Sequence, residues 1–522
     1  MNTISNSTRL RRGAGALIAI ILLAILAAPP HRTAIAGVQG QAVYDAALHT
    51  YIANQMEAYK IPGMSVAVVR YGEVEFADGF GVANPAGEPV TADTPFLLAS
   101  VSKGITALAV MQLVEAGELS LDDPVREHLP WFEVERGRGG EITVAQLLYQ
   151  TSGLTELAGR EANLRPDGPD ALEEAVRAIA AEKLAFAPGE GWEYSNLNYD
   201  VLGLLVQEVS GQPYGDYIDT NIFAPLEMDK SFASLEAART GGAPGGYYPF
   251  FGIPLVFDGL MPYSRATLPS AGLWSSADDL SHYLIALLDG GSYGGRSLLS
   301  EAGVTALHTA GHMFNDEQGY AMGWTVNHNF VLPELLAGTG LEEFAGMTIL
   351  FHEGDGLSYK AMAFLIPEIE LGVILLMNTN DPTVTSAFRF FGWDVALVAL
   401  GAEAQYFPPG EEFAVRYARW IGAVVVLLLA AGLGWMLRKL RRLRAGSPPS
   451  PAERRGAVLL AIAAVLPAAY GLLILFPDQS SSLPVVIRYL PDIGLLTLAG
   501  IALPVGLAVV TAMLVAGSRR QG

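Results

Sequence analysis

Residues 96–103 read FLLASVSK and contain the one S-x-x-K pattern of the chain, Ser100 and Lys103. The residues from there to 116 are apolar at almost every position, which predicts a buried helix. A lysine in the first turn of such a helix is costly unless it is paired or neutral. Because burial lowers a lysine pKa, Lys103 is a candidate base for the hydroxyl three residues earlier. The alternative is a helix-capping serine beside a lysine that extends to solvent.

The second pattern is Tyr194-Ser195-Asn196, the one Y-x-N among twenty tyrosines. It follows an Ala-Pro-Gly turn at 187–189 and precedes a helical run from Tyr199. A phenol beside a lysine can relay a proton, and an amide two residues on can bind a substrate carbonyl. The alternative is a helix cap with a packed aromatic ring.

The third pattern is His352-Glu353-Gly354, which ends an apolar run typical of a strand. A glycine on an edge strand lets a substrate approach the backbone, where N–H groups can bind an oxyanion. His308 and His312 are four residues apart and suit one face of a helix, but no H-E-x-x-H pattern accompanies them. We therefore expect no metal and no cofactor.

Taken together and in this order, the three patterns resemble the serine β-lactamase and penicillin-binding-protein superfamily, whose elements include S-x-x-K and K-T-G. The most similar branch is the class C β-lactamase-related group of esterases, D-alanyl-D-alanine carboxypeptidases and D-aminopeptidases, which uses Y-x-N and often H-x-G. The resemblance covers about 43–400. Family-like stretches also occur at 119–125 (LSLDDPV), 147–154 (LLYQTSGL), 186–196 (FAPGEGWEYSN) and 271–280 (AGLWSSADDL). Gln150 stands where the family often has histidine, and we expect no consequence.

The resemblance implies roles for individual residues. Ser100 attacks a carbonyl and forms an acyl-enzyme, while Lys103 and Tyr194 take and return its proton. Asn196 holds the carbonyl of the substrate amide or ester.

The third pattern departs from the family by lacking its lysine. His352 takes the place of that lysine, Gly354 keeps the strand open, and the backbone N–H groups of Ser100 and Asp355 form the oxyanion hole. Glu353 and Asp355 flank the gap, and their charges should disfavour substrates with a free carboxylate, such as penicillins. Neutral or cationic esters or amides are therefore expected to fit better than β-lactams.

The order of predicted elements agrees with the fold that the resemblance implies, an α/β (α+β) sandwich of an antiparallel sheet flanked by helices, plus a helical domain. Strands are predicted at 63–69 and Glu73–Gly81 around a Tyr71-Gly72 turn, and at 348–352, 361–365 and Leu371–Met377. Helices are predicted at 43–59, 171–182 and 278–288. The aromatic, glycine-rich segment 241–259 reads either as a loop over the cleft or as a plain surface loop.

Charge is distributed unevenly along the 522 residues, whose formal net charge is -21. Residues 1–36 hold four Lys+Arg and no acid, and residues 420–522 hold ten Lys+Arg and three acids. The 18 basic and 50 acidic residues between them give that segment a net charge of -32. Such a body repels polyanions, so nucleic acid is not expected as a partner. The absence of cysteine excludes disulfides and thiolate chemistry.

The N-terminus has the layout of a secretory signal peptide. A basic segment runs through Arg12, an apolar stretch covers 16–28, and Ala34-Ile35-Ala36 offers a cleavage site. The alternative is an uncleaved N-terminal anchor.

The C-terminal hundred residues carry three apolar runs, 420–437, 456–476 and 493–517, each long enough to cross a bilayer as a helix. Seven Arg and Lys residues crowd 438–455, between the first two runs. The positive-inside rule places this connection in the cytoplasm and the acidic body outside. We expect a multi-pass cell-membrane protein with a lipid-bilayer partner.

The predicted organisation is a signal peptide at 1–36, a hydrolase domain at 37–406, a linker at 407–419 and a three-helix transmembrane anchor at 420–522. The predicted function is that of a membrane-anchored, extracytoplasmic serine hydrolase acting on small-molecule or peptide esters or amides. One alternative is a penicillin-binding-type receptor, acylated at Ser100 and coupled to the membrane helices, although the short cytoplasmic connection leaves no room for an effector domain. Another is an inactive binding module, which the intact motifs disfavour.

Overall fold

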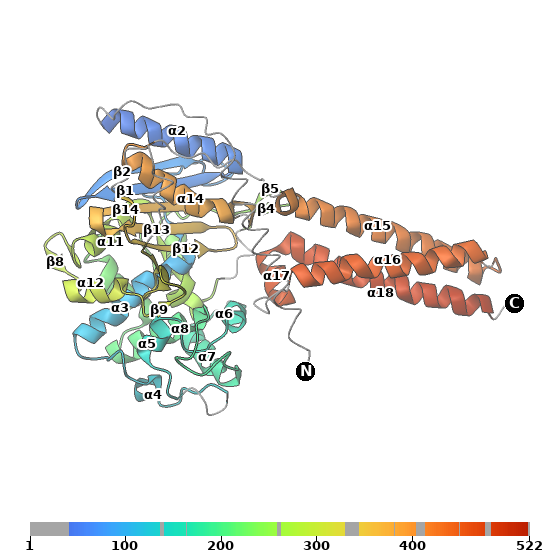
Figure 1. Ribbon diagram of the computed structural model, residues 1–522, viewed down its shortest axis with the longest axis horizontal. Helices are drawn as coiled ribbons and strands as arrows, with labels where there is room; N and C mark the ends of the chain where they lie inside the picture. The colour runs from blue at the N-terminus through green and yellow to red at the C-terminus, as the bar shows by residue number, and fades with distance from the viewer. Residues whose placement is uncertain are drawn as a thin grey trace.

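The computed structural model describes residues 41–135, 140–162, 164–257, 263–328, 344–380, 382–402, 413–447, 449–475 and 482–519. The predicted signal peptide at 1–36 lies outside these residues. Figure 1 shows a domain built around one sheet and, beside it, a bundle of long C-terminal helices.

The sheet has eight antiparallel strands in the order β2-β1-β14-β13-β12-β11-β10-β9. β1 pairs with β14 from Met64 opposite Met377 to Arg70 opposite Leu371, so the two ends of the domain share one sheet. This arrangement confirms the predicted sheet of N- and C-terminal parts with helices between them. The strands are β1 (Gly63–Arg70), β2 (Glu73–Gly81), β9 (His312–Met313), β10 (Gln318–Tyr320), β11 (Thr325–Asn327), β12 (Ile349–Asp355), β13 (Lys360–Ile366) and β14 (Leu371–Met377).

Helices cover both faces of the sheet (Figure 1). α2 (Gln41–Tyr59) and α14 (Pro382–Ala399) pack on one face over a core that includes Ile52, Phe364 and Phe391. α11 (Ala277–Leu288) packs on the other face, where β1, β13 and β14 are buried against the larger core cluster. The central strands are apolar at nearly every position because both of their faces are covered.

The middle of the chain forms the predicted helical domain, on the side of the sheet where β12 ends. Its central helix, α8 (Asn196–Ser210), packs against α3 (Ser102–Glu115), and both are almost fully buried. The surrounding helices are α4 (Val125–His128), α5 (Val144–Leu148), α6 (Glu156–Ala162), α7 (Ala171–Ala178), α9 (Tyr214–Ile218), α10 (Leu235–Thr240) and α12 (Glu301–His308). Short strand pairs join β3 (Phe96–Leu97) to β6 (Trp274–Ser275), and β7 (Ser292–Tyr293) to β8 (Arg296–Ser297).

The segment 241–259 contains a β-hairpin rather than a loop over the cleft. β4 (Tyr247–Phe250) pairs with β5 (Ile253–Val256) across a turn in which Phe251 and Gly252 take positive φ angles. Aromatic residues before this turn and β-branched and aliphatic residues after it favour paired strands. Figure 1 shows the hairpin at the start of the C-terminal bundle.

The C-terminal bundle contains α15 (Phe413–Arg444), α16 (Pro451–Leu475), α17 (Leu483–Tyr489) and α18 (Pro491–Arg519). The prediction of three spans is corrected to two candidates within the described residues, Arg419–Arg444 and Pro491–Ala516, which are long and apolar enough to cross a membrane. The run at 456–476 falls in α16, whose first turns carry Glu453 and two arginines, and whose side chains beyond 464 lie outside the described set.

The described residues between 41 and 402, built around the sheet, are called the hydrolase-like domain below after the family resemblance. The basic connection between α15 and α16 lies at the end of the bundle far from this domain, whereas α17 lies at the near end (Figure 1). Residues 413–419 of the predicted linker are the first turns of α15, and residues 403–412 lie outside the described set.

Candidate active site

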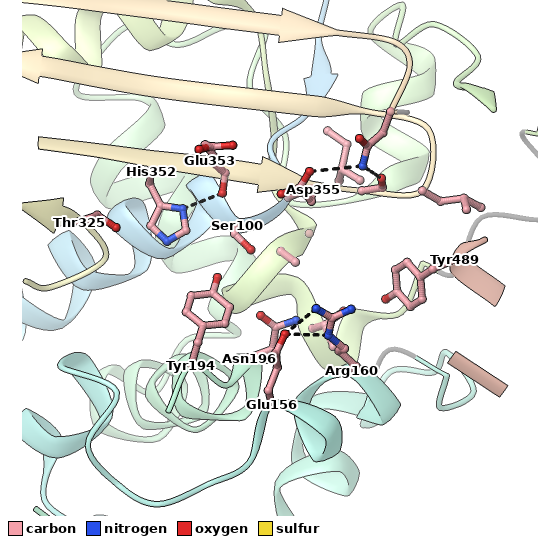
Figure 2. A pocket seen from close by; sticks show the side chains of 18 of the residues that line it. Ser100, Glu156, Arg160, Tyr194, Asn196, Thr325, His352, Glu353, Asp355 and Tyr489 are labelled. Atoms are coloured by element: carbon pink, nitrogen blue, oxygen red, sulfur yellow. Dashed lines mark hydrogen bonds and ion pairs between the residues drawn. The ribbon is translucent and has the colours of Figure 1, made fainter. Parts of the chain in front are cut away.

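A cleft of about 760 Å³ lies between the end of β12 and the helical domain, and all three sequence patterns reach it. Ser100, Tyr194, Asn196, His352 and Asp355 line it. Figure 2 shows Ser100 between the strand that carries His352 and the segment that carries Tyr194 and leads into α8 at Asn196.

Ser100 sits in a 3₁₀ turn, Ala99–Val101, immediately before α3. Ala99 has a φ of 45°, in the left-handed region that a residue with a Cβ atom rarely adopts. Such strain is stored where the surrounding structure enforces it, commonly at functional sites. Here it presents the Ser100 side chain to the cleft while Ala99 and Val101 remain buried.

Lys103 is completely buried beneath Ser100 and makes three hydrogen bonds. Its Nζ donates to Ser100 Oγ at 3.1 Å, to Asn196 Oδ1 at 2.8 Å and to the Ser270 carbonyl at 2.7 Å. Burial lowers the pKa of Lys103, and the nearby Asp200 carboxylate opposes this effect. A neutral amine keeps two N–H groups and one lone pair. The Asn196 side-chain oxygen and the Ser270 carbonyl can only accept, so the two N–H groups of neutral Lys103 bind them. Its lone pair then faces Ser100, and in this form of Lys103 the Ser100 hydroxyl is the donor.

Tyr194 places its ring 4.8 Å from Lys103 Nζ, so the first two patterns meet in space. Burial raises the pKa of Tyr194 well above 10, and the Ser100 side chain is close enough to lower it in part. The phenol therefore keeps its proton at neutral pH and is available as a donor. Because Asn196 Oδ1 faces Lys103, the amide nitrogen is the group that Asn196 can offer to a carbonyl in the cleft.

His352 lies on β12 with 7% of its surface exposed, and its ring is 6.2 Å from that of Tyr194. Its Nδ1 donates to the Glu353 carbonyl at 2.8 Å, which leaves Nε2 as the acceptor 3.4 Å from the Tyr320 hydroxyl. Burial, followed by the Lys103 charge, lowers the pKa of His352 to about 3. The third pattern therefore brings no positive charge to the cleft at neutral pH.

Gly354 lies where β12 crosses the turn that carries Ser100. A Cβ atom at Gly354 would lie 2.0 Å from the Leu98 carbonyl oxygen and 3.2 Å from the Ala99 side chain. Only glycine allows this close approach of two backbone segments. Asp355 follows at the end of the strand, on the rim of the cleft.

The structure places a lysine beside the acids of the third pattern, which the sequence reasoning missed. Lys360 Nζ lies 3.2 Å from Glu353 Oε2 and 2.7 Å from Asp355 Oδ1. It is fully buried on β13, directly opposite Asp355 in the register. Lys360 offsets one of the two acidic charges, so the local field is weaker than the sequence alone suggested. The sequence signal was a lysine immediately before the next predicted strand, at the position that a tight turn would place opposite Asp355.

The sequence reasoning also missed Asp200 and the role of Gln150. The spacing of Asp200 from Asn196, one helical turn, could have indicated the first of these. Asp200 is one turn after Asn196 on α8 and fully buried, and burial raises its pKa while the Lys103 charge opposes the rise. Gln150, expected to be without consequence, instead braces the second pattern. Its Oε1 accepts from the Ser195 backbone at 2.9 Å and from the Asn198 side chain.

No metal site is formed by the histidines or by any other group of three His, Cys, Asp or Glu side chains within the described residues. His308 and His312 do not share a helix, because α12 ends at His308 and His312 begins β9. Burial lowers the pKa of His308 to about 4, and the His312 ring stacks on Trp192 at 6.4 Å.

Comparison with known proteins identifies the fold and its relatives. The family model described as Beta-lactamase matches residues 48–395. Protein flp of Staphylococcus aureus (strain MW2) is 29% identical over 342 residues, which are 65% of this chain and 64% of that protein. The chain thus spans slightly less than two thirds of that relative. Esterase EstB of Burkholderia gladioli is 38% identical over 259 residues, 44% of this chain and 66% of the esterase.

Solved structures also match most of the chain. An octameric penicillin-binding protein homologue from Pyrococcus abyssi superposes with a TM-score of 0.58 at 28% identity, covering 73% of this chain and 81% of the homologue. The D-alanine carboxypeptidase AmpC of Burkholderia cenocepacia superposes with a TM-score of 0.55, covering 69% of this chain and 99% of the carboxypeptidase. The latter is 24% identical and therefore shows the fold alone.

Proposed function

Since the chain belongs to the beta-lactamase family, we propose that it is a serine hydrolase that cleaves esters or amides through an acyl-enzyme on Ser100. The observation that carries this proposal is the hydrogen bond from Lys103 to Ser100 inside a buried network. Neutral Lys103 accepts the hydroxyl proton while Ser100 Oγ bonds to the carbonyl carbon. The tetrahedral adduct then expels the alcohol or amine, which takes a proton relayed through Tyr194, and water later releases the acid.

The remaining roles follow from the positions around Ser100. Asn196 holds the substrate carbonyl through its amide nitrogen, and the backbone N–H groups of Ser100 and Asp355 stabilise the oxyanion. Gly354 supports this assignment because its missing side chain lets β12 approach the Ser100 turn. Neutral His352 holds the Tyr320 hydroxyl and packs beside Tyr194.

Ester hydrolysis is the activity we favour over β-lactam hydrolysis. The cleft contains Glu353 and Asp355 against the buried Lys360, and a second pair in which Arg160 binds Glu156 with Nε at 2.9 Å. With His352 uncharged, no unpaired cation on β12 is ready to bind a substrate carboxylate. The 38% identity to an esterase supports the same substrate class.

We further propose that the protein is secreted through residues 1–36 and anchored by its C-terminal helices, with the hydrolase domain at 37–406 outside the cytoplasm. The basic connection between α15 and α16 lies at the end of the bundle away from that domain (Figure 1), as the positive-inside rule requires of this topology. In this proposal residues 407–419 act as the linker, of which 413–419 are the first turns of α15, and α15 to α18 form the membrane module.

Hydrolysis of a short-chain aryl ester by the full chain in detergent micelles tests this function. We expect turnover by the wild type, loss of at least about a thousandfold in Ser100→Ala, and no change in Ser120→Ala, which alters an exposed serine. Equal turnover in wild type and Ser100→Ala would exclude the mechanism. A penicillin adduct stable for hours, without ester turnover, would instead support the receptor alternative.

A further inference from the structure

One wall of the cleft comes from the C-terminal bundle. Tyr489 and Leu490, at the end of α17 and immediately before α18, line the same cleft as Ser100. Figure 2 shows the Tyr489 side chain entering from α17 with its hydroxyl turned toward the interior, on the side of Arg160. The hydrolase-like domain alone therefore leaves the cleft incomplete.

A buried ion pair fixes this wall to the rest of the site. Asp492 is fully buried, and its Oδ2 lies 2.8 Å from Arg419 Nε of α15. The same oxygen accepts from the Phe251 backbone at 2.9 Å, and Oδ1 accepts from the Tyr248 hydroxyl at 2.5 Å. Because Tyr248 and Phe251 belong to the β4–β5 hairpin, two helices of the bundle and the hydrolase-like domain meet at one carboxylate.

The wall also lies at the boundary of the apolar bundle. Arg419 and Pro491 are the first residues of the two candidate membrane spans, and Tyr489 precedes Pro491 by two positions. Aromatic residues that favour membrane interfaces are exposed at the same end, with Tyr417 at 40% and Trp420 at 53%.

The hairpin adds an exposed apolar edge next to this boundary. Ile253, Leu255 and Val256 are 59%, 42% and 39% exposed, and the Phe251 ring lies 6.0 Å from that of Trp420. Exposed aliphatic side chains beside interfacial aromatic residues are typical of a surface that touches lipid.

We infer that the substrate is an amphiphile carried by the bilayer, with its ester or amide at the depth of the head groups. Its apolar portion stays in the lipid while the carbonyl reaches Ser100 past Tyr489 and Leu490, which determine specificity. This inference rests on the proposed function. The chemistry is unchanged: Ser100 Oγ bonds to the carbonyl carbon, the bond to the alcohol or amine breaks with proton return, and water releases the acid.

Two p-nitrophenyl esters that differ only in acyl length test this inference on the full chain in phospholipid vesicles. The butyrate reacts mainly from water, whereas the palmitate resides in the bilayer. We expect the ratio of palmitate to butyrate kcat/KM to fall at least about tenfold in Tyr489→Ala and in Leu490→Ala. Tyr417→Ala is the matched control, since it removes an exposed aromatic residue at the same end without touching the cleft, and its ratio should equal that of the wild type.

The possible outcomes distinguish failure of this inference from failure of the proposed function. Butyrate turnover that depends on Ser100, with the same ratio in wild type, Tyr489→Ala and Leu490→Ala, would overturn the inference and leave the hydrolase intact. An equal fall in Tyr417→Ala would also overturn it, because the effect would then belong to the membrane end in general. Absence of Ser100-dependent turnover of either ester would contradict both the inference and the proposed function. Butyrate turnover in each variant shows that the variant is folded.

Discussion

Lys103 Nζ lies 2.8 Å from the side-chain oxygen of Asn196, which joins the S-x-x-K and Y-x-N patterns in one hydrogen-bonded network. The two residues come from the first turns of adjacent buried helices, α3 and α8. Because both helices are packed on nearly all sides, neither side chain can move away without leaving a buried polar group unpaired. The network thus holds the Lys103 amine against Ser100 before any substrate arrives.

Asp200→Asn should shift the acidic limb of the pH profile of kcat/KM to lower pH. The base form of Lys103 is the active one, so activity rises as pH passes through the Lys103 pKa. Burial lowers that pKa and the Asp200 charge raises it, hence removing the charge lowers it further. The plateau should fall by less than about tenfold because Ser100 and Lys103 remain. Asp122→Asn, an exposed control, should reproduce the wild-type profile, and an unchanged limb in Asp200→Asn would refute the coupling.

His352→Asn should flatten the dependence of unfolding free energy on pH. The folded pKa of His352 is lowered to about 3, so between there and its ordinary value near 6.5 the unfolded chain binds more protons. Stability is therefore full above about pH 6.5 and falls as pH drops, by up to ~1.4 kcal/mol per pH unit for this group. Chemical unfolding in micelles at several pH values measures this slope.

His308→Asn should change the pH dependence of stability without changing catalysis. Burial lowers the pKa of His308 to about 4, so its replacement should also flatten the slope. Since His308 lies outside the cleft lining, ester turnover should drop in His352→Asn and remain in His308→Asn. Equal slopes in wild type and His352→Asn would show that this histidine is protonated in the folded state.

Gly354→Ala should reduce both turnover and thermal stability. The added Cβ atom would lie 2.0 Å from the Leu98 carbonyl oxygen, so β12 must separate from the Ser100 turn. Overpacking of this kind costs about 1–3 kcal/mol, and backbone displacement at the oxyanion site should lower kcat by about a hundredfold. Gly168→Ala is the control, because nothing lies within 4 Å of the position that its methyl group would take and its φ is not positive. Wild-type kcat in Gly354→Ala would contradict the proposed role of this crossing.

Asp355→Asn should improve turnover of an ester bearing a free carboxylate relative to a matched neutral ester. Asp355 is half exposed at the cleft rim and shares Lys360 with Glu353, so its removal leaves the lysine paired with one acid. Unit charges about 4 Å apart interact by roughly 1 kcal/mol in water, which corresponds to a gain of about fivefold or more in the ratio of kcat/KM. A ratio that stays constant would show that the rim charge does not select substrates.

The fold and the three site patterns could be predicted because they are local. Strands β1, β2 and β12 to β14, and helices α2 and α11, carry period and turn signals within their own residues. Lys360 lies beside Asp355 because β12 and β13 pair in that register, and the Gln150 side chain accepts a hydrogen bond from the Ser195 backbone. Neither contact can be predicted from the periodicity of a single segment. Tyr489 is the extreme case, since it reaches the cleft from the end of α17 in the C-terminal bundle.

Covalent labelling of Ser100 tests the central claim most directly. The full chain in micelles is treated with a fluorophosphonate, and the modified peptide is located by mass spectrometry. The proposed mechanism predicts one adduct, on Ser100, that disappears in Ser100→Ala and forms at least about a hundredfold more slowly in Lys103→Met, because the buried base is gone. An adduct on another residue, or labelling of Ser100 at the same rate without Lys103, would contradict it.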